Sequence, residues 1–172
     1  MTKYEMPYYI VKQKSANIEI REYESFYTSS VEESDLRGYR GFGVLFSYIS
    51  GSNANQQKIS MTIPVINTFD KEQSMEFVIP KKFSSNIPQP MDQQLKIKKY
   101  NARLVASIRF SGFTSKKRIM YHLDKLTTWI RQQNYDIVGP VQLARYNPPF
   151  SIPWLRRNEI MVPVVKQPIN KD

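Results

Sequence analysis

Short segments in which hydrophobic and polar residues alternate run through this chain, and a period of two is typical of half-buried β-strands. In residues 18–23, Ile18 and Ile20 alternate with charged side chains. Residues 26–31 follow closely enough to be the hairpin partner of that strand, and residues 58–69 show the same alternation. The sequence predicts five further strands, over residues 75–80, 95–100, 103–108, 141–146 and 159–164.

A longer segment, residues 36–50, carries apolar residues at helical spacing. Ser34 or Asp35 can cap it, and Gly51 stands where a helix commonly ends. Its apolar stripe consists of Leu36, Tyr39, Phe42, Phe46 and Ile49. The segment also contains Gly38, Gly41 and Gly43. Each glycine costs about 1 kcal/mol relative to alanine in a helix, so we expect another backbone or a flat ligand to approach there.

A second helix is predicted over residues 116–133, with Thr114 or Ser115 as its cap. Its core stripe consists of Ile119, Leu123, Leu126 and Ile130. His122, the only histidine of the chain, lies to one side of this stripe. We therefore expect a histidine at the surface or flank of the helix rather than in its core.

The pattern of the first half returns in the second half. Ile18-Glu19-Ile20-Arg21-Glu22-Tyr23 is echoed by Leu95-Lys96-Ile97-Lys98-Lys99-Tyr100, and residues 75–80 are echoed by residues 158–163. We expect a single domain over residues 1–172, of the α+β class, with repeats of about 18–80 and 95–163 joined by a linker near residues 83–91. The duplicated β-β-α-β-β unit is predicted to form a distorted β-barrel flanked by two helices.

The chain is basic, with 25 Lys and Arg against 15 Asp and Glu and a formal net charge of +10. Such a balance suits nucleic acid, anionic lipid or an anionic small ligand. The basic residues form short clusters and no long tract, which argues against a nucleic-acid partner.

Other features narrow the class of protein. The absence of cysteine excludes disulfides, thiolate catalysis and cysteine-based metal sites. No window reaches the roughly 18 apolar residues of a membrane-spanning helix. Residues 1–13 lack the apolar stretch of a secretory signal peptide, so the sequence predicts a cytoplasmic protein. No spacing typical of a metal site or a phosphate-binding loop is present. A Ser/His/Asp arrangement is not plausible either, because the one histidine stands in a basic helix.

Three segments, in this order, resemble the SOUL haem-binding protein family. The first is residues 18–23, and the second is Gly41-Phe42-Gly43-Val44-Leu45-Phe46-Ser47-Tyr48-Ile49-Ser50-Gly51-Ser52-Asn53, followed by residues 58–65. The third is Arg145-Tyr146-Asn147-Pro148-Pro149-Phe150, followed by Arg156-Arg157-Asn158-Glu159-Ile160. The resemblance covers roughly residues 5–165 and extends to the gyrase-inhibitor-like ligand-binding domains of bacterial regulators.

The resemblance implies reversible, non-covalent binding of haem or another tetrapyrrole in an open apolar groove between the first helix and the loop before the last strand. It does not require a fixed protein ligand to the iron. The binding residues that it selects are Tyr39, Arg40, Phe42, Phe46, Phe150, Ile152, Trp154, Leu155, Arg156 and Arg157. The chemistry is consistent, because a porphyrin needs apolar faces for its ring and cations for its two propionates.

Phe42, Phe46 and Glu159 could each have a structural role instead of a functional one. Phe42 and Phe46 could equally pack in the core, since a helix buries aromatic residues with or without a ligand. Glu159 could pair with Arg156 or Arg157, or it could be a cleft carboxylate that acts as a general base. The sequence favours a non-enzymatic tetrapyrrole buffer or carrier. The alternatives are a gyrase-inhibitor-like small-molecule-binding or hydrolytic domain that uses Glu159, and a protein-interaction module that uses the Pro148-Pro149-Phe150 loop.

Overall fold

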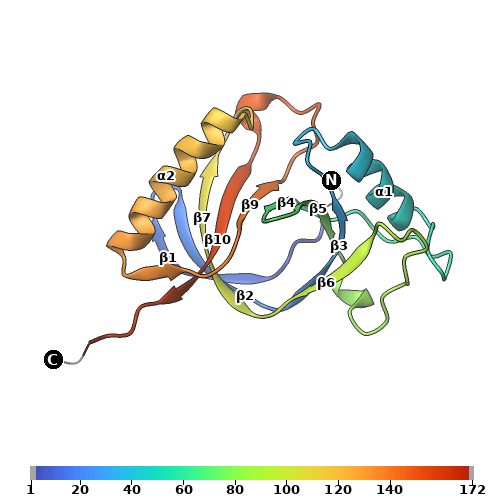
Figure 1. Ribbon diagram of the computed structural model, residues 1–172, viewed down its shortest axis with the longest axis horizontal. Helices are drawn as coiled ribbons and strands as arrows, with labels where there is room; N and C mark the ends of the chain where they lie inside the picture. The colour runs from blue at the N-terminus through green and yellow to red at the C-terminus, as the bar shows by residue number, and fades with distance from the viewer. Residues whose placement is uncertain (1–2, 171–172) are drawn as a thin grey trace.

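The computed structural model describes residues 3–170, which form one curled sheet with a helix on each of its two halves (Figure 1). The sheet curves into a half-barrel, and α1 and α2 lie on its outer side. The elements are, in chain order, β1 (Tyr9–Ser15), β2 (Ile18–Tyr23), β3 (Phe26–Glu32), α1 (Tyr39–Ile49), β4 (Val65–Phe69), β5 (Gln73–Val78), the 3₁₀ turn η1 (Lys81–Phe83), β6 (Lys96–Tyr100), β7 (Arg103–Phe110), α2 (Lys116–Gln132), β8 (Tyr135–Ile137), β9 (Val141–Arg145), the 3₁₀ turn η2 (Pro153–Leu155) and β10 (Asn158–Lys166).

The strands follow the order β1-β2-β7-β10-β9-β4-β5-β3-β6, and β8 pairs with the end of β10. From β2 to β6 this order reads the same in reverse when β2 is exchanged for β6, β7 for β3, β10 for β5, and β9 for β4. A duplicated unit with a two-fold axis between β9 and β4 would produce such an order. The α+β class and the curled sheet with two helices are as predicted, and the duplication itself stays a prediction.

The hairpin predicted between residues 18–23 and 26–31 is wrong. β2 pairs with β1 and β7, whereas β3 pairs with β5 and β6 in the other half of the sheet. The chain between them crosses from one half to the other instead of turning back. Residues 58–64 are not a strand either, and β4 begins only at Val65, directly after Pro64. Proline lacks the N–H that a ladder needs, so it ends the pairing there.

Each helix packs its buried side against one half of the sheet. Leu126 and Ile130 of α2 lie in a cluster with Ile20, Ile108 and Ile160. Ser115 caps α2 by accepting a hydrogen bond from the Arg118 backbone N–H, so both the predicted cap and the predicted core stripe are confirmed. The core under α1 is formed by Leu45, Tyr48, Ile49, Met75 and Phe77, among others.

The first helix begins later than predicted. Gly38, with φ of 62°, precedes α1 and no side chain caps it, so neither Ser34 nor Asp35 is the cap. A Cβ at Gly38 would collide with the side chain of Met75, which explains why glycine stands there. Leu36 lies before the helix and packs against the core on the α2 side.

The opposite faces of the same strands point into the half-barrel. In β10, Ile160 and Val162 face α2, whereas Glu159 and Met161 face inward. The cavity that remains beside Tyr23 and Met161 has a volume of about 10 Å³. That is about the space of one water molecule, so side chains fill the inner face at this point. A wider hollow of about 560 Å³ opens beside Tyr100, Arg103 and Gln142.

The strand order makes each half depend on the other. The first strand of each predicted repeat, β2 or β6, pairs with a strand of the opposite half. We therefore expect fragments 1–88 and 89–172 to be unfolded when separate and to regain the native circular dichroism spectrum when mixed. A cooperative unfolding transition in either fragment alone would contradict this dependence.

Candidate functional site

The outward side of α1 is aromatic. Tyr39, Phe42 and Phe46 are 80%, 40% and 50% exposed; Tyr39 and Phe46 lie about one turn before and after Gly43 on the solvent side of the helix, and Phe42 lies at the flank. A surface helix normally presents polar side chains there. We call Tyr39, Phe42, Gly43 and Phe46 the aromatic face of α1.

Two rings of the aromatic face lie against each other. Phe42 and Phe46 are stacked with ring centroids 5.9 Å apart and an angle of 12° between their planes. The other side of Phe42 meets the edge of Phe77, 5.2 Å away, so the surface is anchored to the core beneath it. The core-packing alternative therefore holds only in part, because Phe42 touches the core while both rings stay open to solvent.

Gly41 and Gly43 stand in the first helix for different reasons. The backbone N–H of Gly41 donates to the buried carboxylate of Glu33 at 2.6 Å, and a Cβ at Gly41 would crowd that carboxylate. At Gly43 a Cβ would meet no atom within 4 Å. A close approach thus exists at Gly41, but a side-chain carboxylate makes it and not the other backbone or flat ligand expected from the sequence, and Gly43 leaves open space beside the aromatic rings.

Two arginines stand near the N-terminal end of the aromatic face. Arg40 donates to Gln94 Oε1 at 2.6 Å and to the carbonyl of Glu32 at 2.8 Å. Arg37 is exposed and lies 3.3 Å from the carboxylate of Asp35. These guanidinium groups are the cations that α1 and the turn before it supply.

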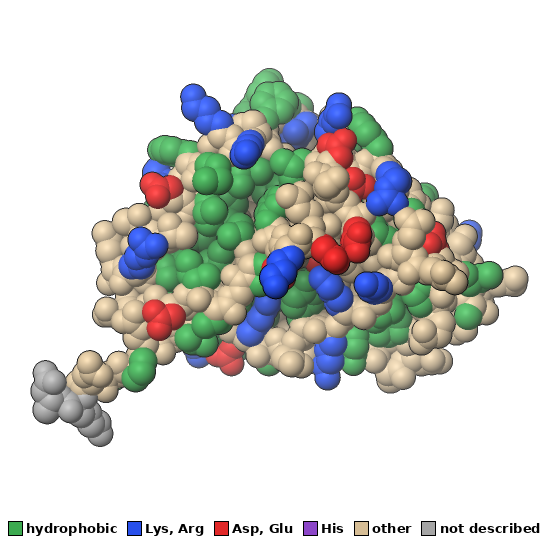
Figure 2. Space-filling view, viewed as in Figure 1, with side chains coloured by type: hydrophobic (Ala, Val, Ile, Leu, Met, Phe, Trp, Pro, Cys, Tyr) green, Lys and Arg blue, Asp and Glu red, His purple; other side chains and the backbone are tan. Residues whose placement is uncertain are grey.

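The loop that precedes β10 exposes the other predicted apolar residues. Phe150 is 89% exposed and Trp154 is 73% exposed, and Ile152 and Leu155 are exposed as well. Hydrophobic side chains cap the molecule in Figure 2 at the place where η2 lies in Figure 1. The backbone N–H of Gly112 donates to the carbonyl of Pro153 at 2.8 Å, which ties η2 to the segment before α2.

The two predicted arginines of this loop have their own partners. Arg156 donates to the carbonyls of Pro149 and Ser151, at 2.7 and 2.9 Å, and so holds the loop in shape. Arg157 turns into the half-barrel, where it contacts Glu159. Whether any residue selected from the sequence binds a ligand stays a prediction, but these two guanidinium groups are engaged within the protein.

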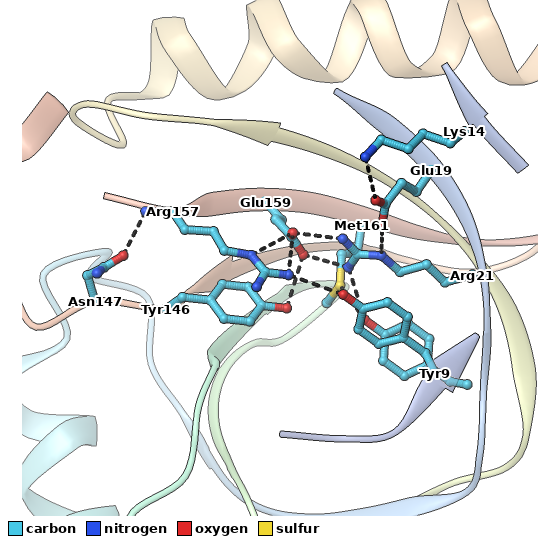
Figure 3. A network of polar contacts seen from close by, with 10 residues as sticks. Tyr9, Lys14, Glu19, Arg21, Tyr146, Asn147, Arg157, Glu159 and Met161 are labelled. Atoms are coloured by element: carbon cyan, nitrogen blue, oxygen red, sulfur yellow. Dashed lines mark hydrogen bonds and ion pairs between the residues drawn. The ribbon is translucent and has the colours of Figure 1, made fainter. Parts of the chain in front are cut away.

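Glu159 is the centre of a buried ionic cluster (Figure 3). It accepts hydrogen bonds from Arg21 at 2.6 and 2.8 Å, from Arg157 at 3.0 Å and from the Tyr146 hydroxyl at 3.0 Å. The predicted ion pair with Arg157 is confirmed. Arg21 was not predicted, because its alternation with Ile20 suggested a solvent-facing side chain. Only the apolar Tyr23 two residues later hinted that this side is covered too.

The cluster keeps Glu159 ionised. Burial by itself would raise the pKa of its carboxyl, but the hydrogen bonds and charges of Arg21 and Arg157 outweigh burial, and the pKa lies below its usual value of 4.5. Burial raises the pKa of the Tyr146 hydroxyl well above its usual range, so the hydroxyl remains a donor. A general base near neutral pH needs a raised pKa, and this carboxylate has the opposite shift.

Glu76 occupies the corresponding position in the other half. It is fully buried and accepts hydrogen bonds from Thr28, Thr68 and Tyr100 at 2.8, 2.5 and 2.7 Å. Lys98 lies 3.7 Å away. Both carboxylates are therefore surrounded by donors and serve the packing of the inner face.

His122 lies apart from the aromatic face. It projects from α2 and stacks on Phe110 with ring centroids 4.2 Å apart. Burial, together with the charges of Arg118 and Lys125, lowers its pKa below the usual value of 6.5. Among residues 3–170, no three His, Asp or Glu side chains gather as metal ligands would, and no helix is long and apolar enough to cross a membrane.

Comparison with known proteins identifies a protein family that this chain matches. A family model described as SOUL heme-binding protein matches residues 4–163. Heme-binding protein 1 of Sus scrofa is 28% identical over 130 residues, which cover 67% of this chain and 65% of that protein. The match thus spans less than two thirds of the relative's own length.

Solved structures share the fold at low identity. The C-terminal domain of EcmrR has a TM-score of 0.64 and 13% identity, over 87% of this chain and 97% of that one. A hydrolase from Listeria innocua has a TM-score of 0.60 and 9% identity, over 90% and 94% of the two chains. At such identities the likeness shows the arrangement of strands and helices alone.

Replacing Glu159 by glutamine should destabilise the fold by about 3–5 kcal/mol at pH 7, because buried Arg21 would lose its two-pronged carboxylate partner and keep only the single ionic contact with Glu19 at 2.7 Å. A lowered folded-state pKa means that the carboxylate stabilises the protein above about pH 4.5, and that this contribution is lost as the pH falls through the folded pKa. The difference between wild type and Glu159→Gln in urea unfolding should therefore narrow at acidic pH.

Glu22→Gln is the matched control for this experiment, since Glu22 forms a solvent-exposed pair with Lys12 at 3.4 Å. We expect a change of at most about 0.5 kcal/mol for this control. Equal costs for the two variants at pH 7 would show that the buried cluster does not stabilise the fold.

Proposed function

The chain belongs to the SOUL heme-binding protein family, and we propose that it binds haem or another porphyrin non-covalently on the aromatic face of α1. The proposal assigns the ring to Phe42, Phe46 and the open space over Gly43. It rests most on one observation, which is that the side of α1 turned away from the sheet is aromatic rather than polar.

The residues present suit the chemistry of a porphyrin. The rings of Phe42 and Phe46 offer exposed apolar area, and each Å² of apolar area removed from water contributes about 25 cal/mol. Arg37 and Arg40 lie near one end of these rings and would hold the propionates by exchanging their present contacts with Asp35 and Gln94. Phe150 and Ile152 of the loop before β10 are the remaining apolar candidates.

The open geometry favours a buffer or carrier role over catalysis. Bound haem would supply the redox and ligand-exchange chemistry of its iron, and the protein residues described here would bind and orient the ring. The only histidine projects from α2 and stacks on Phe110, so the proposal needs no histidine ligand. Weak fixation of this kind suits a ligand that must be released.

The hydrolytic alternative has less support. It would use Glu159 as a base, but three donors already surround that carboxylate and its pKa is lowered. The cavity of about 10 Å³ beside Tyr23 and Met161 offers no room for a substrate in that part of the half-barrel. A binding role on the outer surface does not need that room.

Hemin titration of the purified protein should give a saturable Soret change with micromolar or tighter affinity, which corresponds to about −8 kcal/mol. Phe46→Ala should weaken binding at least about tenfold, the effect of losing about 1.4 kcal/mol. The variant should cost less than about 1.5 kcal/mol of folding free energy, because the ring is half exposed.

Two control variants make this titration specific. Leu45 is fully buried next to Phe46, so Leu45→Ala should cost about 2–5 kcal/mol of stability and leave the affinity of the folded protein nearly unchanged. His122→Ala should also retain the Soret change. Loss of that change in His122→Ala, or an unaltered affinity in Phe46→Ala, would place the haem elsewhere.

Gly43 offers a test in which stability and binding move in opposite directions. Gly43→Ala should raise the free energy of unfolding by about 0.5–1 kcal/mol, because a Cβ there meets no neighbour and alanine favours the helix. Gly43→Leu fills the open space beside the aromatic rings and should weaken hemin binding at least about tenfold. Wild-type affinity in Gly43→Leu would mean that the porphyrin does not lie over this helix.

A further inference from the structure

Two loops meet at the end of the molecule where α2 begins. The Gly112 N–H donates to the Pro153 carbonyl, and the guanidinium of Arg156 lies 5.7 Å from the centre of the Phe113 ring. Asn158 donates to the Gly112 carbonyl at 2.9 Å. These contacts hold residues 111–118 and 147–157 together as one surface.

This surface is apolar at its tip. Five large hydrophobic side chains are exposed on it, although short polar residues are usual in connecting loops. We call them the apolar tip, and they are Phe113, Phe150, Ile152, Trp154 and Leu155. Phe113 remains 63% exposed although it lies beside the segment that follows η2.

The two segments that carry the apolar tip have charges of one sign. Segments 111–118 and 147–157 contain no Asp or Glu, and they contribute Lys116, Lys117, Arg118 and Arg156 to this end of the molecule, while Arg157 turns inward to Glu159. Lys116 and Lys117 are exposed in the first turn of α2. Figure 2 shows the hydrophobic side chains at the top of the molecule, with Lys and Arg side chains to the left and both basic and acidic side chains to the right.

We propose that the apolar tip docks onto the surface of a membrane that contains anionic phospholipid. Trp154, Phe113 and Leu155 would enter the boundary between headgroups and acyl chains, where tryptophan is favoured. Lys116 and Lys117 would lie at the level of the lipid phosphates, where each basic residue contributes roughly a fivefold gain in affinity. Charge complementarity distinguishes this occupant from a neutral apolar protein surface.

Membrane docking goes beyond haem binding and does not depend on it. The aromatic face of α1 is not part of the apolar tip, although Phe150 and Ile152 are candidates for both surfaces. The experiment therefore uses the full chain without haem and changes only residues that belong to the tip or to its basic rim.

The haem-free protein should co-sediment with vesicles of phosphatidylcholine containing about 30% phosphatidylserine, and binding should weaken as salt is raised from 50 to 500 mM. The variant Trp154→Ala/Leu155→Ala and the variant Lys116→Glu/Lys117→Glu should each bind at least about tenfold more weakly. The chain has two tryptophans, so Trp129→Phe leaves Trp154 as the only emitter. Its fluorescence should shift to the blue when anionic vesicles are added.

Matched controls lie at the other end of α2, roughly 25 Å away for a helix of 17 residues. Val138→Ala removes an exposed apolar side chain, and Arg131→Glu/Lys166→Glu makes the same change of net charge. Both should bind vesicles like the wild type. Failure to sediment with anionic vesicles, equal binding to pure phosphatidylcholine, or equal loss in the controls would each overturn the proposal, and the first result would leave a protein partner as the occupant.

Discussion

The buried pairing of Glu159 with Arg21 and Arg157 is the constraint on which the rest of the structure depends. Arg21 comes from β2 in the first half of the chain and Glu159 from β10 in the second, so the cluster fastens the two halves across the inner face. Glu76 and Tyr100 make the corresponding link from β5 to β6. A buried charge is costly unless it is paired, so these contacts fix how the strands meet on the inner face.

Our proposal places binding on the outside of the sheet. Both helices lie there, but they present different surfaces to solvent. α2 exposes Lys116, Lys117, Asp124 and Lys125 together with Met120 and Tyr121, whereas α1 exposes a stacked pair of phenylalanines beside a glycine. The family membership and this difference together support the assignment of the ligand to α1. The same account gives Glu159 a structural role and no part in chemistry.

The sequence predicted what short-range patterns encode. The stripe of Ile119, Leu126 and Ile130 and the cap at Ser115 located α2 to within a residue, because both signals are local. Strand partners depend on contacts between distant segments, so the β2–β3 hairpin was predicted wrongly. β1 was missed because most of its side chains are exposed at the sheet edge and no alternation marks it. At the candidate site, the exposure of Phe42 and Phe46 could not be predicted, since an aromatic stripe also suits a core.

The central claim is that the porphyrin lies on the aromatic face of α1, and ferric haem can report its own position. Its unpaired electrons broaden the amide signals of nearby residues in ¹H–¹⁵N spectra of the labelled protein. Our account predicts that substoichiometric hemin first broadens the signals of Phe42, Gly43 and Phe46, while those of His122 and Leu126 on α2 stay sharp. Selective broadening around His122, with the α1 signals unchanged, would contradict it.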